Sequence, residues 1–126
     1  MTDIDRSAAP AADVPPLELP LDETLERLGG DRDLFATLAD LHRSESLAAL
    51  DTMRGLLDRG DVAGLGQVAH RLAGSLLVFG AVTAVTAARQ VEHLASAGQA
   101  NLRQHLATLE LELHRVNAAL DRALRT

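Results

Sequence analysis

Apolar residues recur along most of this chain at intervals of three and four, which is the spacing of one face of an α-helix. The pattern is most regular near the C-terminus, where a helix from about residue 101 to the end is predicted. Its apolar positions are Leu102, Leu106, Leu109, Leu113, Val116 and Leu120. A helix over residues 62–79 has a similar stripe, made of Val62, Leu65, Ala69, Leu72, Leu76 and Phe79. Such narrow seams are typical of helices that pack in bundles.

Another long helix is predicted between an acidic cap, either Asp31 or Asp33, and about Leu57. Its apolar positions are expected at Leu34, Leu38, Leu41, Leu50, Met53 and Leu57. The apolar phase is blurred around residues 44–46, which allows a bend there.

A short helix over residues 21–28 and a fourth long helix over residues 82–97 complete the prediction, with Gly-containing turns between the segments. Long helices joined by short turns pack as antiparallel neighbours. The predicted fold is therefore all-α, an antiparallel up-down-up-down four-helix bundle with a short N-terminal capping helix. Residues 1–19 are rich in Ala, Asp and Pro, so we expect a disordered leader or a linker there, followed by the bundle over residues 20–126.

Composition supports the helical fold and excludes several classes of function. The 126 residues suffice for one core, and Leu and Ala, both helix-favouring, supply most of the apolar positions. The net charge of −6 argues against a nucleic-acid partner. Because Cys is absent, a disulfide framework and a thiolate nucleophile are excluded. No segment suits a secretory signal or a membrane span, so we expect a soluble, cytoplasmic protein with no membrane insertion.

Among the five His residues of the chain, His70 has the most unusual surroundings. It falls outside the apolar stripe of its helix, on a flank expected to face water. Gly66 and Gly74 lie four residues to either side, although each Gly inside a helix costs about 1 kcal/mol relative to Ala. Either a neighbouring helix packs closely there, or the space is kept for a partner or a group bound to the imidazole. Leu77 and Val78 add apolar groups to this flank, which makes it a candidate docking face.

The residues around His70 resemble the signature of the histidine phosphotransfer (HPt) family. Two stretches carry the likeness, His70-Arg71-Leu72-Ala73-Gly74-Ser75 and Phe79-Gly80-Ala81. The family pattern is His, any residue, Leu, Lys, Gly and then Ser or Ala, followed a turn later by an apolar residue, Gly and Ala. Further matches are the turn Arg59-Gly60-Asp61 and the pair Val91-Glu92. The similarity covers about residues 20–120.

The resemblance implies a bacterial two-component phosphorelay, in which His70 accepts a phosphoryl group from one receiver-domain aspartate and passes it to another. Gly74 would leave room beside the ring, and Gly80 would be a close-packing point at the helix end. Glu92 or Gln90 would accept a hydrogen bond from one ring nitrogen and so orient the other for attack. The chain would be a phosphoryl carrier rather than a turnover enzyme, with response-regulator receiver domains and a hybrid histidine kinase as partners.

The implied chemistry needs little machinery on this chain. An ordinary imidazole, with a pKa near 6.5, is mostly uncharged at neutral pH and can attack a phosphoaspartate without a separate strong base. No cofactor is expected here, because the partner's receiver domain would hold the Mg²⁺ that neutralises the phosphoryl oxygens.

The sequence departs from the family pattern at Ala73, where members usually have a Lys that stabilises the added negative charge. Arg71, or Arg89 on the next helix, is the candidate replacement for a phosphoryl contact. We therefore expect a weaker or more labile phosphohistidine than is usual in the family, or the loss of transfer.

Two other functions compete with the phosphoryl carrier. A catalytically silent module on the same scaffold would dock a receiver or a kinase without phosphotransfer, and Ala73 favours it. An unrelated helical bundle could dimerise through its C-terminal seam, but ordinary core packing explains that seam, so we expect a monomer. A metal site is not predicted, because the remaining histidines lack metal-ligand spacing: His42, His93, His105 and His114.

Overall fold

A computed structural model of the chain describes residues 16–98 and 101–125. This part is helical and contains no strand. Its helices are α2 (Leu21–Arg27), α3 (Arg32–Asp58), α4 (Val62–Val78), α5 (Val82–Ala97) and α6 (Leu102–Arg125). None of them is both long and apolar enough to cross a lipid bilayer. The prediction of an all-α protein is confirmed.

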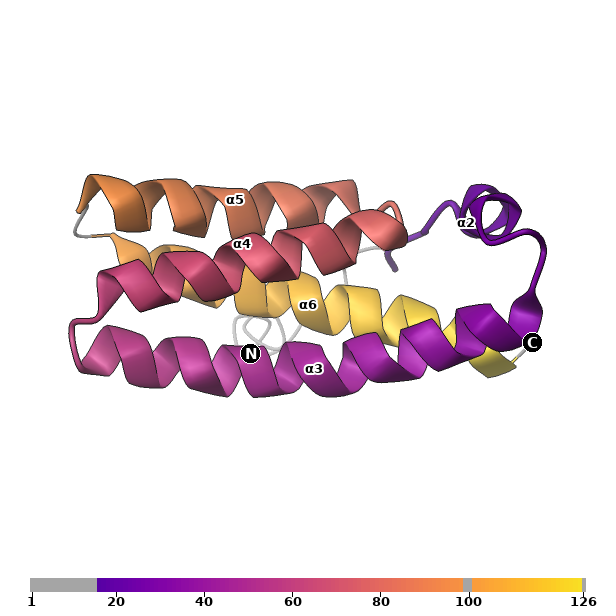
Figure 1. The fold of residues 1–126 in the computed structure, drawn as a ribbon, viewed down its shortest axis with the longest axis horizontal. Helices are drawn as coiled ribbons and strands as arrows, with labels where there is room; N and C mark the ends of the chain where they lie inside the picture. Colours follow the sequence, from indigo (N-terminus) through magenta and orange to yellow (C-terminus); the bar gives the residue numbers. More distant parts are fainter. Residues whose placement is uncertain (1–15, 99–100, 126) are drawn as a thin grey trace, which may run out of the picture.

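The four long helices form an antiparallel bundle (Figure 1). Each packs on two neighbours, because α4 and α6 both contact α3 and α5. The short helix α2 lies past the turn that joins α4 to α5, alongside the first turns of α3 and the last turns of α6. The arrangement is the predicted up-down-up-down bundle with a short N-terminal helix at one end.

Acidic side chains fix where two of the helices begin. The Asp31 carboxylate accepts a hydrogen bond from the Leu34 amide at 3.0 Å, and Asp61 does the same for the Gly64 amide. Each therefore satisfies one of the free amides in the first turn of its helix. The helix α5 stops at Gly98, whose φ of 68° is left-handed. The helix limits agree with the predicted ones to within about two residues.

The core follows the predicted stripes of α4 and α6. All six apolar positions predicted for α6 are buried, and so are five of the six predicted for α4. Ala73, which the sequence pattern did not place in the core, is also buried at 4% exposure. These two seams were predictable because their apolar residues lie on one side of the helix only.

The predicted apolar phase in the first half of α3 is wrong. Leu34 and Leu41 are 40% and 51% exposed, although both were expected in the core. The buried positions of this half are Phe35, Ala39, His42 and Ser46. The second half agrees better with the prediction, since Leu50 and Met53 are buried.

The buried polar side chains of α3 have hydrogen-bond partners on neighbouring helices, although the described residues offer none to the buried atoms His42 Nε2 and Asn117 Oδ1. His42 is only 3% exposed, and its Nδ1 lies 2.7 Å from Ser75 Oγ on α4. Its ring also lies against Phe79, with the two ring centroids 5.4 Å apart. One turn along, the buried Ser46 hydroxyl accepts a hydrogen bond from Asn117 of α6 at 3.2 Å. Burial lowers the pKa of His42 from 6.5 to about 4, so this imidazole is uncharged at neutral pH.

The predicted leader of residues 1–19 falls largely outside the described residues. At its end, Leu17 and Leu19 are half-buried and pack against the core of the bundle. Arg122 of α6 donates a hydrogen bond to the Leu17 carbonyl at 2.9 Å. The segment before α2 therefore already contacts the bundle.

The helix α2 is tied to the end of α4 by two contacts. Arg27 donates a hydrogen bond to the Val78 carbonyl at 2.7 Å, which satisfies one of the free carbonyls at the end of α4. Gly80 has a φ of +64°, and a Cβ at this position would come within 2.5 Å of Pro20 Cγ. Only glycine fits such a conformation against such a close neighbour. Gly80 is thus a close-packing point between α2 and the turn after α4.

Candidate functional site

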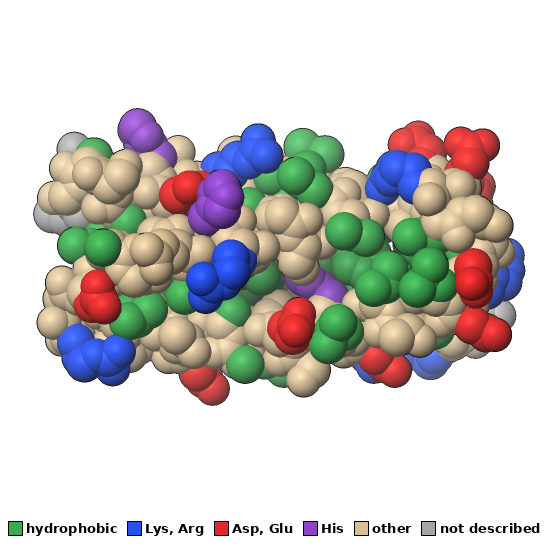
Figure 2. Space-filling model, viewed as in Figure 1, with side chains coloured by type: hydrophobic (Ala, Val, Ile, Leu, Met, Phe, Trp, Pro, Cys, Tyr) green, Lys and Arg blue, Asp and Glu red, His purple; other side chains and the backbone are tan. Residues whose placement is uncertain are grey.

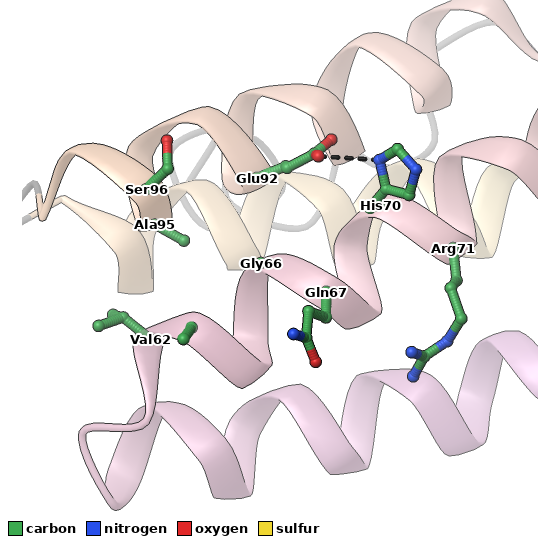
Figure 3. Close-up of a pocket in the computed structure, with 9 residues that line it drawn as sticks. Val62, Gly66, Gln67, His70, Arg71, Glu92, Ala95 and Ser96 are labelled. Atoms are coloured by element: carbon green, nitrogen blue, oxygen red, sulfur yellow. Dashed lines mark hydrogen bonds and ion pairs between the residues drawn. The ribbon is translucent and has the colours of Figure 1, made fainter.

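His70 lies on α4 at the face shared with α5, and its side chain is 72% exposed. Its Nδ1 is 2.8 Å from Oε2 of Glu92 on α5 (Figure 3). An ionised carboxylate can only accept a hydrogen bond, so Nδ1 carries the proton and donates it. The other ring nitrogen, Nε2, points away from Glu92 and keeps its lone pair. The site therefore presents an accessible imidazole whose orientation is set by Glu92.

The two glycines that flank His70 have different surroundings. A Cβ on Gly66 would lie 3.4 Å from the Cβ of Ala95, so this glycine lets α5 approach α4 closely. A Cβ on Gly74 would meet nothing within 4 Å. Packing therefore explains Gly66, whereas Gly74 leaves open space one turn beyond the imidazole. The close-packing explanation considered from the sequence therefore holds for Gly66, and none of the described helices accounts for Gly74.

A groove runs beside the imidazole between α4 and α5 (Figure 3). Small residues shape its floor, among them Ala63, Gly66 and Ala95, and the polar side chains of Gln67 and Ser96 line it. Figure 2 shows an exposed imidazole on this face with charged side chains of both signs around it. The ring thus stands at the edge of a shallow concave surface rather than inside an enclosed pocket.

The two candidates for orienting His70 lie on different sides of α5. Glu92 contacts the imidazole directly, as described above. Gln90 instead lines a groove between α5 and α6, together with His105 and Glu112. The structure therefore brings Glu92, and not Gln90, to His70. Two residues along a helix amount to about 200° of rotation, which is why both cannot face the same neighbour.

The two arginines considered for a phosphoryl contact also differ in position. The Arg71 side chain points towards α3 and lines a groove between α3 and α4 that also contains Glu45 (Figure 3). Arg89 is exposed and lies three residues before Glu92 on α5. Within residues 16–98 and 101–125, no carboxylate forms an ion pair with either guanidinium. Both positive charges are available to a bound anion.

An apolar patch, defined as Leu41, Leu77 and Val78, lies on the same face of the molecule. These side chains are 51%, 49% and 38% exposed. The hydrogen bond between His42 and Ser75 places the relevant turns of α3 and α4 side by side. Figure 2 shows apolar side chains gathered between α3 and the C-terminal end of α4. Sequence analysis had found Leu77 and Val78 but had assigned Leu41 to the core.

Sequence reasoning missed the contact between the buried His42 and the half-buried Ser75. A single His in a helix gives no signal of burial, and only the blurred apolar phase of α3 hinted at polar core positions. Ser75 lies five residues after His70, so its contact with His42 joins α3 to the helix that carries the exposed imidazole. Across the described parts of the chain, no three His, Asp or Glu side chains come together as a metal site.

Comparison with known proteins agrees with this geometry. The family model described as Hpt domain matches residues 33–124, which is most of the chain and includes α4 and α5. Searches of curated proteins and of solved structures found no match. The match contains both His70 and Glu92 within the bundle that positions them. The chain therefore belongs to the Hpt domain family, the histidine phosphotransfer modules of phosphorelays.

Proposed function

We propose that this Hpt domain is an active phosphoryl carrier, in which His70 takes a phosphoryl group from one receiver-domain aspartate and passes it to another. The hydrogen bond from His70 Nδ1 to Glu92 is the observation that carries the proposal. It leaves the lone pair on Nε2, the nitrogen that faces solvent and an approaching partner. The carrier alternates between two states and needs no turnover of its own.

The transfer step follows from that tautomer. The lone pair of Nε2 attacks the phosphorus of the phosphoaspartate, and the bond between phosphorus and the carboxylate oxygen breaks. The aspartate leaves as a carboxylate with the electron pair of that bond. The ring gains positive charge while Nδ1 keeps its proton, and the Glu92 carboxylate at 2.8 Å stabilises this charge. The reverse sequence delivers the phosphoryl group to the next receiver.

Phosphoryl transfer of this kind depends on positioning and charge stabilisation more than on covalent machinery. The attacking and leaving atoms must lie roughly in line with phosphorus, so the partner has to approach along the direction of the Nε2 lone pair. The 72% exposure of His70 and the open space beside Gly74 permit that approach. The partner's receiver domain would bring the Mg²⁺ and the acidic pocket that the step requires.

The proposed partners are response-regulator receiver domains and a hybrid histidine kinase, which the carrier would meet in the cytoplasm as a monomer. The apolar patch of Leu41, Leu77 and Val78 gives such a partner a surface to bury near the imidazole. A cation from Arg71 or Arg89 would contact the phosphoryl oxygens, since the usual Lys is replaced by Ala73.

The second candidate function is a silent module that docks a receiver or a kinase without accepting phosphate. One observation favours it: Ala73 is apolar and buried where the family pattern has a cation. The other features of the site, including the oriented imidazole, are compatible with both the phosphoryl carrier and the silent module. The two candidates therefore differ in chemistry and not in docking.

Phosphoryl transfer from a panel of phosphorylated receiver domains separates them. The wild-type protein and His70→Gln are followed by intact mass, with His93→Gln as a matched control because His93 is another exposed histidine next to Glu92 in sequence. We expect one added phosphoryl group on the wild type and on His93→Gln, and none on His70→Gln. A wild type that binds a receiver but gains no mass would identify the silent module instead.

A further inference from the structure

We infer that Arg89 provides the positive charge that binds the phosphoryl group on His70, in place of the Lys that Ala73 replaces. The inference rests on the proposed function and adds a residue to it: a cation on the neighbouring helix rather than on the helix of the phosphoacceptor. Three features of the site support it, namely helix register, the direction of Arg71, and the balance of charge.

The register of the two helices places Arg89 beside the open space near the imidazole. His70 faces Glu92, and Gly66 faces Ala95, so α4 and α5 run antiparallel along this contact. The turn of α5 before Glu92 therefore lies beside the turn of α4 after His70, which holds Gly74. Arg89 belongs to that turn of α5, about 4.5 Å along the helix from Glu92.

Arg89 also lies on the correct side of α5. Glu92 and Ser96 both line the groove beside His70. Arg89 precedes them by three and seven residues, which places all three on one stripe of the helix. Ala88, its neighbour in sequence, is fully buried, whereas Arg89 is exposed. The long side chain therefore starts at the edge of the interface between α4 and α5, next to the empty volume beside Gly74.

Arg71 is less suited to the same role. It follows His70 directly, so its side chain leaves the helix about 100° away from the imidazole. Figure 3 shows it directed towards α3, where Glu45 lines the same groove. Arg71 also lines the groove beside His70, so a contact with a phosphoryl group on Nε2 would require its guanidinium to turn from α3 towards the imidazole.

The charges at the site require a cation on this side of the ring. Glu92 is already negative, and a phosphoryl group on Nε2 adds up to two further negative charges across one imidazole ring. A guanidinium placed one turn from Glu92 attracts both anions and offers a planar pair of donors to phosphoryl oxygens. In the described part of the chain, no acceptor holds the Arg89 guanidinium elsewhere. With Arg89 in this role, no cation is needed at the buried position of Ala73 to bind the phosphoryl group.

The equilibrium of transfer between this chain and one receiver domain tests the assignment. That equilibrium depends on the free proteins alone, so contacts made only while the two are docked cancel from it. We expect Arg89→Gln to lower the share of phosphoryl group on His70 by about fivefold, the scale of one exposed ion pair. Arg71→Gln should lower the share less than Arg89→Gln does, and Arg89→Lys should restore most of it. Arg103→Gln is the control that should leave the share unchanged, because Arg103 pairs with Asp58 at 3.1 Å, away from the imidazole. The difference should shrink at high ionic strength, because salt screens exposed charges.

A second part of the experiment moves the positive charge from position 89 to position 73. Ala73→Lys introduced into Arg89→Gln should raise the share again, because it returns the cation to the position usual in the family. The thermal midpoint of each variant shows whether it is folded before its equilibrium is compared. An equilibrium equal to that of the wild type in Arg89→Gln would overturn the assignment while leaving the carrier function intact. A wild type that accepts no phosphoryl group would instead overturn the proposed function itself.

Discussion

His42 and His70 have opposite surroundings, although both are helical histidines of the same bundle. His70 is 72% exposed and is hydrogen-bonded to the carboxylate of Glu92. His42 is 3% exposed and is hydrogen-bonded to the hydroxyl of Ser75. The exposed ring can reach a partner, and its Nδ1–H donates a hydrogen bond to Glu92, which favours nucleophilic attack by Nε2. The buried ring is held uncharged by its surroundings and serves the packing of α3 on α4.

Removal of Glu92 should slow the transfer to His70. Glu92→Ala eliminates both the orientation of the ring and the negative charge that stabilises it, so we expect the rate to fall about tenfold, the effect of one hydrogen bond to a charged group discounted for exposure. The amide oxygen of Glu92→Gln can still accept a hydrogen bond from Nδ1, so its transfer rate should lie between those of Glu92→Ala and the wild type. Single-turnover kinetics with one phosphorylated receiver measure both variants. Equal rates in Glu92→Ala and the wild type would show that the hydrogen bond has no part in transfer.

The lowered pKa of His42 predicts how the stability of the fold depends on pH. The neutral ring is favoured in the folded state, and the unfolded chain binds a proton more readily, with a pKa of 6.5 against about 4. Stability from this residue is therefore complete above the unfolded pKa and is lost as the pH falls from 6.5 towards 4. We expect a loss of about 2 kcal/mol between pH 7.5 and pH 5.

Urea unfolding at several pH values checks this prediction. In His42→Gln, the amide can still bond to Ser75, but nothing titrates at that position, so the loss between these pH values should largely disappear. Exposed histidines such as His93 serve as the comparison, because replacing one of them should leave the pH dependence in place. The same slope in the wild type and His42→Gln would contradict the assignment.

Helices α4 and α6 were predicted well because each has a one-sided apolar stripe that tertiary contacts leave unchanged. The buried face of the first half of α3 was not predicted, because it depends on polar partners from other helices: Ser75 bonds to Nδ1 of His42, and Asn117 donates a hydrogen bond to Ser46. Such pairing is invisible until the helices are placed together. A sequence pattern that assigns leucine to the core and polar residues to the surface then selects the wrong face.

The residues of the candidate site also fall into those that the sequence predicted and those that depend on helix packing. The motif and its resemblance to a family identified His70, and helical spacing placed it on the exposed side of α4. The choice between Glu92 and Gln90 could not be made from the sequence, because it depends on which side α5 turns towards α4. The choice between Arg71 and Arg89 depends on the same packing angle and register.

The open space at Gly74 predicts that one substitution there raises the stability of the fold while it slows phosphoryl transfer. Gly74→Ala should stabilise the fold by about 1 kcal/mol, since the position is helical and the added methyl group meets nothing within 4 Å. The same methyl group narrows the approach to His70, so transfer should slow several-fold.

Gly55→Ala in α3 is the matched control for that variant. A Cβ there meets only the end of the flexible Arg59 side chain at 3.5 Å, so the stability gain should be similar. Denaturant unfolding and transfer rates are compared for the two variants. Transfer that is unaffected in Gly74→Ala would mean that the space beside the imidazole has no role in access.

For the whole molecule, the apolar patch and the imidazole on one face predict where a receiver docks. Leu77→Asp places a charge in the patch and should weaken receiver binding by about tenfold, the scale set by the loss of one well-buried interface side chain. Leu111→Asp is the control, because Leu111 is exposed at 58% but lies on α6, away from the patch. Isothermal titration calorimetry with one receiver measures both. Equal weakening by the two substitutions would place the interface elsewhere.

The most direct test of the central claim is to locate the phosphoryl group after transfer from a receiver domain. Phosphorus and nitrogen NMR of the protein labelled at its histidines identifies both the residue and the ring nitrogen. The hydrogen bond from Nδ1 to Glu92 predicts a single phosphoryl group on Nε2 of His70. A phosphoryl group on Nδ1, or on another residue, would contradict the account. Its complete absence, in a protein that still binds the receiver, would show that the fold docks partners without accepting their phosphate.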